Sequence, residues 1–292
     1  MGSRVNFLVL WTSALLSSGL PEHPPPMHPV DPAVPAVSMV QVRANAVDER
    51  TRQARKAEAR KAEALRPWEL HRYVTCSHHK AGVDLSKDLT AQVFKGLGLN
   101  MTQDFGAWNF HCDGVGKLYC FNRQAPVRIE TDCCSVQSAQ NEQAAYPLQP
   151  IRVANSVRDP LDMVASAYCY HHRGMEWFND VYSPQEVMKM DVQEGVQFMA
   201  QTMLDVVANM TSFLEHPHVE VHAVSFEIIS ASSAGFDAEL EKLLDFWFRG
   251  LITEEERKKA VELARMVDLH RYPQFEEPGH TNDAECMAAA RA

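Results

Sequence analysis

The 292-residue sequence lacks several patterns that mark redox, metal and nucleotide sites. Its seven cysteines never form Cys-x-x-Cys, which argues against a thioredoxin-type pair and against a zinc knuckle. The phosphate-loop pattern Gly-x4-Gly-Lys-Ser/Thr is missing too, because His111 stands where Gly116-Lys117 would need the first glycine. The sequence also has no internal repeat. These absences weigh against redox, zinc-finger and phosphate-loop kinase activities.

Positive charge is scarce in most of the chain. Residues 67–292 carry 19 Lys and Arg against 32 Asp and Glu, whereas residues 1–66 carry 9 against 6. An acidic body argues against nucleic acid as a partner, because such binding needs a broad positive surface. A small anionic ligand at a local positive site remains compatible with it. With 46% hydrophobic and 23% charged residues, the composition is that of a folded globular protein.

The amino terminus has the order of a secretory signal. Arg4 precedes an apolar run over residues 5–16, and small residues follow at 17–19. The run is short for a spanning helix, which needs about 20 apolar residues. Residues 5–20 together could still form a Golgi-type signal anchor in the membrane, and a leader with incidental apolar residues is a third alternative. We expect entry into the secretory pathway.

Residues 21–66 separate this segment from the body. Seven prolines in 21–37 predict an extended linker, and the Ala-, Arg-, Lys- and Glu-rich stretch 43–65 predicts a solvated helical stem. The expected organisation is a signal peptide or anchor (1–20), a linker and stem (21–66) and a body (67–292). Glycosylation sequons at Asn100 and Asn209, and a pairing of Cys112 with Cys120, would fit an oxidising lumen.

Strands and helices alternate along the body. Strands are predicted at 73–77, 127–131, 151–157 and 219–226, and helices at 83–97, 160–170, 184–214, 236–249 and 253–267. Asp159 is the expected cap of the second helix, Thr253 and Glu256 form a capping box, and Gly195 is the expected weak point of the third helix. Residues 100–126 show no regular pattern. The alternation predicts an α/β fold with a mainly parallel sheet.

The turn after the first strand, at residues 80–82, could hold an anion. It exposes backbone N–H groups at a helix amino terminus, where the helix dipole favours negative charge. Lys80 adds a mobile positive charge. An ordinary strand-to-helix turn would have the same short sequence.

A second turn, after the strand at 151–157, carries Arg158. This position lies at the carboxyl end of a buried strand, where open α/β sheets bind ligands. A guanidinium can hold a phosphate through two hydrogen bonds, and the Ser166 hydroxyl could donate a further one. The alternative is that Arg158 pairs with a carboxylate such as Asp162.

Together the two turns resemble the cofactor signatures of the sulfotransferase family, which uses 3′-phosphoadenosine 5′-phosphosulfate. The first signature is a strand, Lys-x-Gly-Thr/Ser and a helix, and the second is Arg-x-Pro-x-Asp with a Ser eight residues after the Arg. The matching residues are Lys80, Ala81, Gly82, Val83 and Asp84 for the first, and Arg158, Pro160, Asp162 and Ser166 for the second. Residues 224–227 are similar to the family's Tyr-Glu strand end. The resemblance covers roughly residues 70–275.

The resemblance implies a P-loop-NTPase-like three-layer sandwich, with a central, mainly parallel sheet flanked by helices. It implies that Lys80 and the turn through Asp84 hold the 5′-phosphosulfate, that Lys80 neutralises the leaving oxygen, and that Arg158 and Ser166 hold the 3′-phosphate. Transfer would be in-line, driven by positioning and charge neutralisation, with no metal required. Val83 replaces the family's usual hydroxyl residue, and Asp84 places a carboxylate near the expected anions.

The general base is expected on the strand before the second signature, where many members have a histidine. Glu130 and Asp132 occupy that region and, being two residues apart, face the same side. Either could accept a proton if burial raises its pKa, and Asp132 lies nearer the family position. His78 and His79 are expected to shape the turn instead. His216, His218, Glu220 and His222 alternate along a strand, too far apart to share one ion, so no metal site is predicted.

The sequence therefore predicts a sulfotransferase that acts on a hydroxyl or amine acceptor, a small molecule or a glycan, in the Golgi lumen. One rival is a degenerate member that binds the nucleotide without turnover, which Val83 and Asp84 motivate. A second rival is a small-molecule kinase on a related sheet, against which the missing phosphate-loop pattern weighs.

Overall fold

The computed structural model describes residues 65–99, 105–108, 125–131, 134–176, 182–215, 219–275 and 284–292. They belong to the second of two units of the chain, Lys56–Ala292. The predicted leader, the linker and all but the last two residues of the stem region lie outside the described residues, as do Asn100, Cys112, Cys120, Asp132, His216 and His218. Within the described residues, no helix is both long enough and apolar enough to span a membrane.

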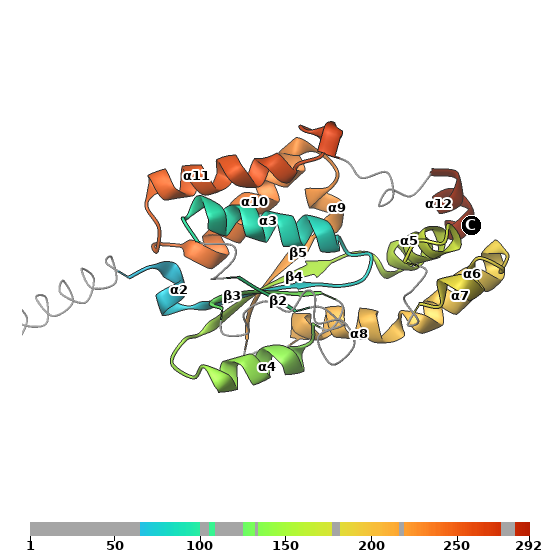
Figure 1. Ribbon diagram of the computed structural model, residues 1–292, viewed down its shortest axis with the longest axis horizontal. Helices are drawn as coiled ribbons and strands as arrows, with labels where there is room; N and C mark the ends of the chain where they lie inside the picture. Colours follow the sequence, from blue (N-terminus) through green and yellow to red (C-terminus); the bar gives the residue numbers. More distant parts are fainter. Residues whose placement is uncertain are drawn as a thin grey trace, which may run out of the picture. The chain divides into compact units, whose positions relative to one another are not determined.

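Five strands form one parallel sheet in the order β2-β3-β1-β4-β5. They are β1 (Arg72–Ser77), β2 (Phe105–Trp108), β3 (Val127–Thr131), β4 (Ile151–Val157) and β5 (Glu220–Ser225). Four lie where the sequence predicts strands, and helices cover both faces, so the α/β class with a parallel sheet is confirmed (Figure 1). The prediction of no regular structure in 100–126 is wrong at β2. This four-residue edge strand contains a glycine and shows no alternation long enough to detect.

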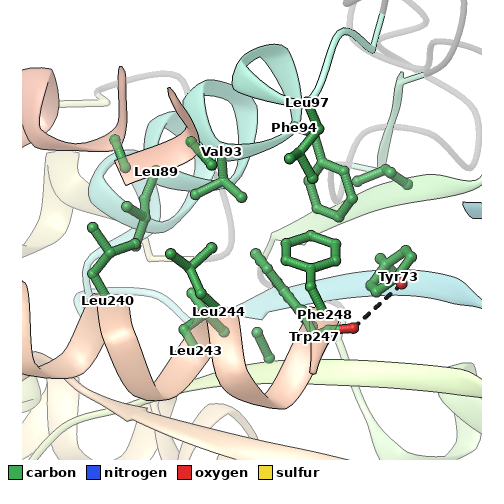
Figure 2. Close-up of a cluster of buried hydrophobic side chains, with 14 of the residues drawn as sticks. Tyr73, Leu89, Val93, Phe94, Leu97, Leu240, Leu243, Leu244, Trp247 and Phe248 are labelled. Atoms are coloured by element: carbon green, nitrogen blue, oxygen red, sulfur yellow. Dashed lines mark hydrogen bonds between the residues drawn. The ribbon is translucent and has the colours of Figure 1, made fainter. Parts of the chain in front are cut away.

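One face of the sheet is covered by α3 (Val83–Gly96) and α10 (Ser233–Phe248), and α11 (Glu254–Ala264) packs on α3 (Figure 1). Figure 2 shows the apolar side chains between these helices and the strands. The predicted caps are present, because the Thr253 hydroxyl accepts from the Glu256 N–H and the Glu256 carboxylate accepts from the Thr253 N–H. α10 begins three residues before the predicted start, because the Ser232 hydroxyl caps it by accepting from the Gly235 N–H.

The opposite face is covered by α4 (Val136–Ala145) and α8 (Leu204–Ser212) (Figure 1). α5 follows β4, and its predicted cap is present, since Asp159 Oδ1 accepts from the Leu161 N–H at 2.8 Å. The remaining elements are α2 (Pro67–Leu70), α5 (Pro160–His172), α6 (Pro184–Val187), α7 (Val192–Thr202), η3 (Phe213–Glu215), α9 (Phe226–Ile229), η4 (Arg265–Val267), η5 (Pro273–Phe275) and α12 (Ala284–Arg291).

The single helix predicted over 184–214 is wrong: α6, α7 and α8 replace it. The breaks fall around Asp191, which caps α7 by accepting from the Glu194 N–H, and at Met203. Gly195, the expected weak point, lies inside α7. A Cβ there would stand 2.3 Å from the Tyr168 ring, so the glycine allows α7 to approach α5 closely.

Two disulfides join distant parts of the described chain. Cys76 of β1 bonds to Cys134, just before α4, and Cys169 of α5 bonds to Cys286 of α12, with Cα–Cα distances of 5.4 and 5.9 Å. The sequence predicted neither pair, because their partners are 58 and 117 residues apart.

Candidate functional site

The chain makes a strained turn between β1 and α3. Lys80 and Gly82 both have left-handed backbone conformations, with φ of 63° and 83°. A Cβ on Gly82 would lie 2.7 Å from the Phe226 ring, so this position requires glycine for its conformation and for its packing. The N-cap residue of α3 is Gly82, which has no side chain to cap the helix, and the N–H groups of a first helical turn have no partners within the helix itself. The turn therefore offers an anion several backbone donors at one point.

Arg158 reaches this turn from the neighbouring strand. β1 and β4 pair in parallel, so their carboxyl ends meet at one edge of the sheet. Arg158 Nη1 donates to the Lys80 carbonyl at 2.6 Å, across 78 residues of sequence, and the Ser156 hydroxyl donates to the Ala81 carbonyl. The two turns that carry the predicted signatures are thus one structural site.

The Arg158 guanidinium retains hydrogen-bonding capacity. It packs 4.5 Å from the Phe226 ring, and burial lowers its pKa. Its Nε is buried without a hydrogen-bond partner among the described residues, which is uncommon for a buried donor. Asp162, the alternative partner for Arg158, forms a 2.7 Å ion pair with Arg291 of α12, although its charge still acts to raise the pKa of Arg158 against the effect of burial. An anionic ligand would supply the acceptor that Nε lacks.

The second turn is braced by the end of β5. The backbone N–H of Asp159 donates to Glu227 Oε1 at 2.7 Å, and the Ser225 hydroxyl donates to the other carboxylate oxygen of Glu227. Residues 224–227, noted for their similarity to the family, therefore help to fix the backbone beside Arg158.

The other predicted cofactor residues take varied positions. The Lys80 ammonium lies 2.9 Å above the centre of the Tyr170 ring, a cation–π contact on α5. Val83 and Asp84 begin α3, and Asp84 pairs with Lys87 at 2.7 Å on the helix exterior. Ser166 is buried in α5, which suits a phosphate ligand less well than the position of Arg158 does.

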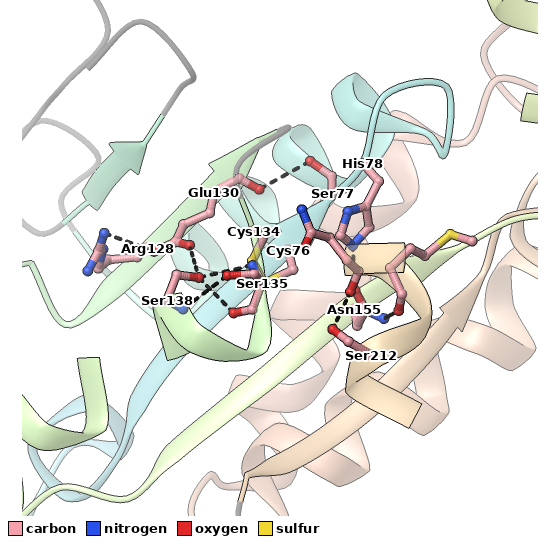
Figure 3. Close-up of a disulfide and its surroundings, with 12 residues drawn as sticks. Cys76, Ser77, His78, Arg128, Glu130, Cys134, Ser135, Ser138, Asn155 and Ser212 are labelled. Carbon is pink, nitrogen blue, oxygen red and sulfur yellow. Dashed lines mark hydrogen bonds and ion pairs between the residues drawn. A yellow bond between two sulfur atoms is a disulfide. The ribbon is translucent and has the colours of Figure 1, made fainter. Parts of the chain in front are cut away.

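Glu130 belongs to a different environment (Figure 3). Its carboxylate is buried towards α4, where it accepts from the Ser138 hydroxyl at 2.9 Å and pairs with Arg128 at 2.9 Å. Burial raises its pKa, and Arg128 and Ser138 oppose that rise. A carboxylate acts better as a general base when its pKa is raised. However, Arg128 and Ser138 already contact the two carboxylate oxygens of Glu130. Its role as base stays a prediction, and that of Asp132 concerns a residue outside the described part of the chain.

Three buried histidines, His78, His79 and His171, lie close to the turn between β1 and α3. His78 Nε2 lies 2.8 Å from Asn155 Oδ1, and burial lowers the pKa of His78 to about 4. His79 stacks on Tyr182 with ring centres 3.9 Å apart, and its Nε2 lies 3.0 Å from Nε2 of His171. Sequence reasoning found His78 and His79 as turn residues and interpreted His171 only as the end of a helix. The available signal was weak: His171 lies five residues after Ser166, at the end of α5.

The side chains of Glu220 and His222, which alternate along β5, contact different partners. Glu220 pairs with Arg152 at 3.2 Å, whereas His222 Nε2 lies 3.5 Å from Glu239 Oε1 of α10. These separate partners agree with the interpretation of a polar strand face.

Comparison with known proteins adds no family to this geometry: no protein-family model matches the chain, and no curated protein matches it.

Proposed function

We propose that this chain is a sulfotransferase that moves a sulfonate group from 3′-phosphoadenosine 5′-phosphosulfate to a hydroxyl or amine acceptor. The observation that carries the proposal is the 2.6 Å hydrogen bond from Arg158 Nη1 to the Lys80 carbonyl. It joins the two signature-bearing turns at the carboxyl edge of adjacent parallel strands, where open α/β sheets bind ligands. The parallel sheet and the anion-accepting turn after β1 also support the finer assignment, a P-loop-NTPase-like three-layer sandwich.

The residues present fit the cofactor at both of its ends. The backbone N–H groups at the start of α3, with Lys80, would hold the phosphosulfate, and Arg158 would hold the 3′-phosphate with its Nε, which has no partner among the described residues. Asp84 is paired with Lys87 on the helix exterior, so its charge is partly offset. The Lys80 ammonium would have to leave the Tyr170 ring, a contact worth about 0.5–2 kcal/mol.

When bound, the cofactor supplies a sulfonate on a phosphate leaving group. Lys80 would neutralise the charge that develops on the leaving oxygen as the sulfur–oxygen bond breaks. The acceptor oxygen or nitrogen forms the new bond to sulfur and gives up its proton to a base, for which Glu130 and Asp132 are the candidates. The rigid hydrogen bonds from Arg158 and Ser156 to the turn would hold these groups in position.

Two disulfides support placement in an oxidising compartment, since such bonds are rare in the cytosol. Together with the leader sequence they support the Golgi lumen, and a glycan or another secreted molecule as acceptor.

The first test is thermal stability of the chain with 3′-phosphoadenosine 5′-phosphate, against ATP with magnesium. At 100 times its dissociation constant a ligand stabilises the folded state by about 2.7 kcal/mol. We expect that stabilisation with the bisphosphate, and its loss in Arg158→Ala, because the guanidinium provides the 3′-phosphate contact. Arg249→Ala, at a largely exposed arginine directly after α10, is the matched control and should keep it. A folded wild type that neither ligand stabilises would contradict the proposal, and stabilisation by ATP alone would favour a kinase.

A degenerate nucleotide-binding protein is the second candidate function. Both Glu130 oxygens are engaged by Arg128 and Ser138, and Val83 provides no hydroxyl beside the turn. This candidate predicts the same stabilisation by the bisphosphate, without sulfonate transfer from the labelled cofactor to any acceptor in a panel of glycans and phenols.

A further inference from the structure

A cluster of three potential metal ligands lies beside the β1–α3 turn, on the side of α5. His79, His171 and Glu176 each offer one ligand atom, and these three atoms all lie within 4.8 Å of one another. Both imidazoles are buried, and Glu176 is half-buried. A second cluster, of Cys76, Cys134 and Glu130, is unsuited to a metal because a disulfide joins its two sulfurs.

The two imidazoles have the separation that a shared ion needs. Their Nε2 atoms are 3.0 Å apart. Zinc–nitrogen bonds of about 2.0–2.1 Å at a tetrahedral angle place two ligand nitrogens about 3.3 Å apart. A shift of a few tenths of an ångström would therefore accommodate the ion between the rings. The Glu176 carboxylate would complete three protein ligands, and a water molecule could occupy the fourth position.

The outer contact of His171 orients it as a ligand. Its Nδ1 lies 3.2 Å from the Met175 carbonyl, which can only accept, so the proton resides on Nδ1 and the Nε2 lone pair is left facing His79. Metal-binding histidines usually donate their other ring N–H in this way.

We propose that His79, His171 and Glu176 bind one divalent transition-metal ion, for which zinc fits best. Two imidazoles and one carboxylate are a ligand set that zinc accepts. The charge nearby is mixed: the Glu176 carboxylate favours a cation, whereas the Lys80 ammonium, on the residue that follows His79, opposes it. The ion would tie the last turn of α5 to the residue before Lys80 and so fix the turn's backbone. This site requires no bound nucleotide and does not depend on the proposed function.

The test is metal content of the purified chain. The protein is stripped with a chelator, dialysed against zinc and measured for bound metal, and cobalt is substituted as a coloured probe. We expect one zinc per chain, and a cobalt complex with the strong visible absorption of a four-coordinate site. Glu176→Gln should weaken zinc binding at least tenfold, and His171→Asn should abolish it.

Two controls keep the outcome decisive. His222→Asn removes a histidine that also faces a glutamate, Glu239 at 3.5 Å, and should leave the zinc content unchanged. Glu176→Gln changes a half-buried loop residue and should fold, which circular dichroism checks. The proposal is overturned if the folded wild type binds no zinc, or if Glu176→Gln and His171→Asn bind it as the wild type does. In that case the rings share a hydrogen bond, with His79 Nε2 donating to His171.

Discussion

Both faces of the sheet bury apolar side chains, but the face on the side of α4 and α8 also buries a cluster of charges. On the side of α3 and α10, the strands contribute Tyr73, Val127, Ile129, Ala154 and Val224 to one apolar core (Figure 2). On the side of α4 and α8, apolar residues such as Val74 and Val153 are buried together with a cluster of charges, defined here as the ion-pair cluster: Arg72, Arg128, Glu130 and Glu142 (Figure 3 labels Arg128 and Glu130). The cluster lies beside the disulfide between Cys76 and Cys134.

Because of this difference, we expect substitutions in the apolar core and in the ion-pair cluster to affect stability in different ways. Apolar burial is non-directional, so its stabilisation falls gradually as atoms are removed. Buried charges are costly unless each has its partner, so the ion-pair cluster should respond to which partner is lost more than to how many atoms are lost. Arg72 shows this dependence: its Nε donates to Glu142 Oε1 at 2.6 Å, and its Nη2 donates to the Ala125 carbonyl at 2.8 Å.

The largest effect is expected on the apolar face, at Phe94. This fully buried ring lies 5.1–5.3 Å, centre to centre, from the rings of Tyr73, Phe248 and Trp247. Phe94→Ala should lower the free energy of unfolding by about 3–5 kcal/mol, because it removes apolar contacts and leaves a cavity. Denaturant unfolding measures this loss. Phe94→Leu should cost clearly less, and equal losses for the two variants would contradict a packing origin.

On the polar face, Arg72→Met should cost about 3 kcal/mol, because it leaves the buried Glu142 with one cation fewer. Glu142 keeps Arg128 as a partner, which limits the loss. The double variant Arg72→Met with Glu142→Leu should recover part of the stability, since it removes both members of a buried pair. Denaturant unfolding of the two single variants and the double variant measures the coupling. Additive losses would show that the two side chains act independently.

The contrast also explains which part of the fold the sequence predicted. Leu89 and Val93 repeat at helical spacing and bury against the sheet, so periodicity alone located α3. α4 has little apolar periodicity and faces the sheet with Glu142, so the same reasoning passed over it. From the sequence alone a charged residue such as Glu142 is predicted to be exposed to solvent. Its buried partner, Arg72, lies 70 residues away in the chain, so the local sequence gives no sign of the pair.

The candidate site divides in a similar way. The local sequence was enough to place Lys80 and Gly82 in a turn and Arg158 at the end of a strand. Their meeting followed from the rule that parallel strands end at one edge. The pairing of His79 with His171 was not predictable, because it depends on how α5 packs against the turn, and nothing in either local sequence reports that.

The smallest expected change in the free energy of unfolding concerns the hydroxyls of Thr75 and Thr90, on the side of the sheet that α3 and α10 cover. Thr90 Oγ1 donates to the Ser86 carbonyl at 2.7 Å, so the Thr75 hydroxyl must be the donor in the 2.8 Å contact between the two threonines. Thr75→Val removes one donor and leaves only an acceptor lone pair unmet, so we expect a loss below about 1 kcal/mol. Thr90→Val leaves the Thr75 donor buried and unsatisfied, which costs about 1–2 kcal/mol. Unfolding measurements on both variants test this order. A reversed order would mean that the two hydroxyls donate in the opposite direction, and that this face has a polar requirement that its apolar composition does not reveal.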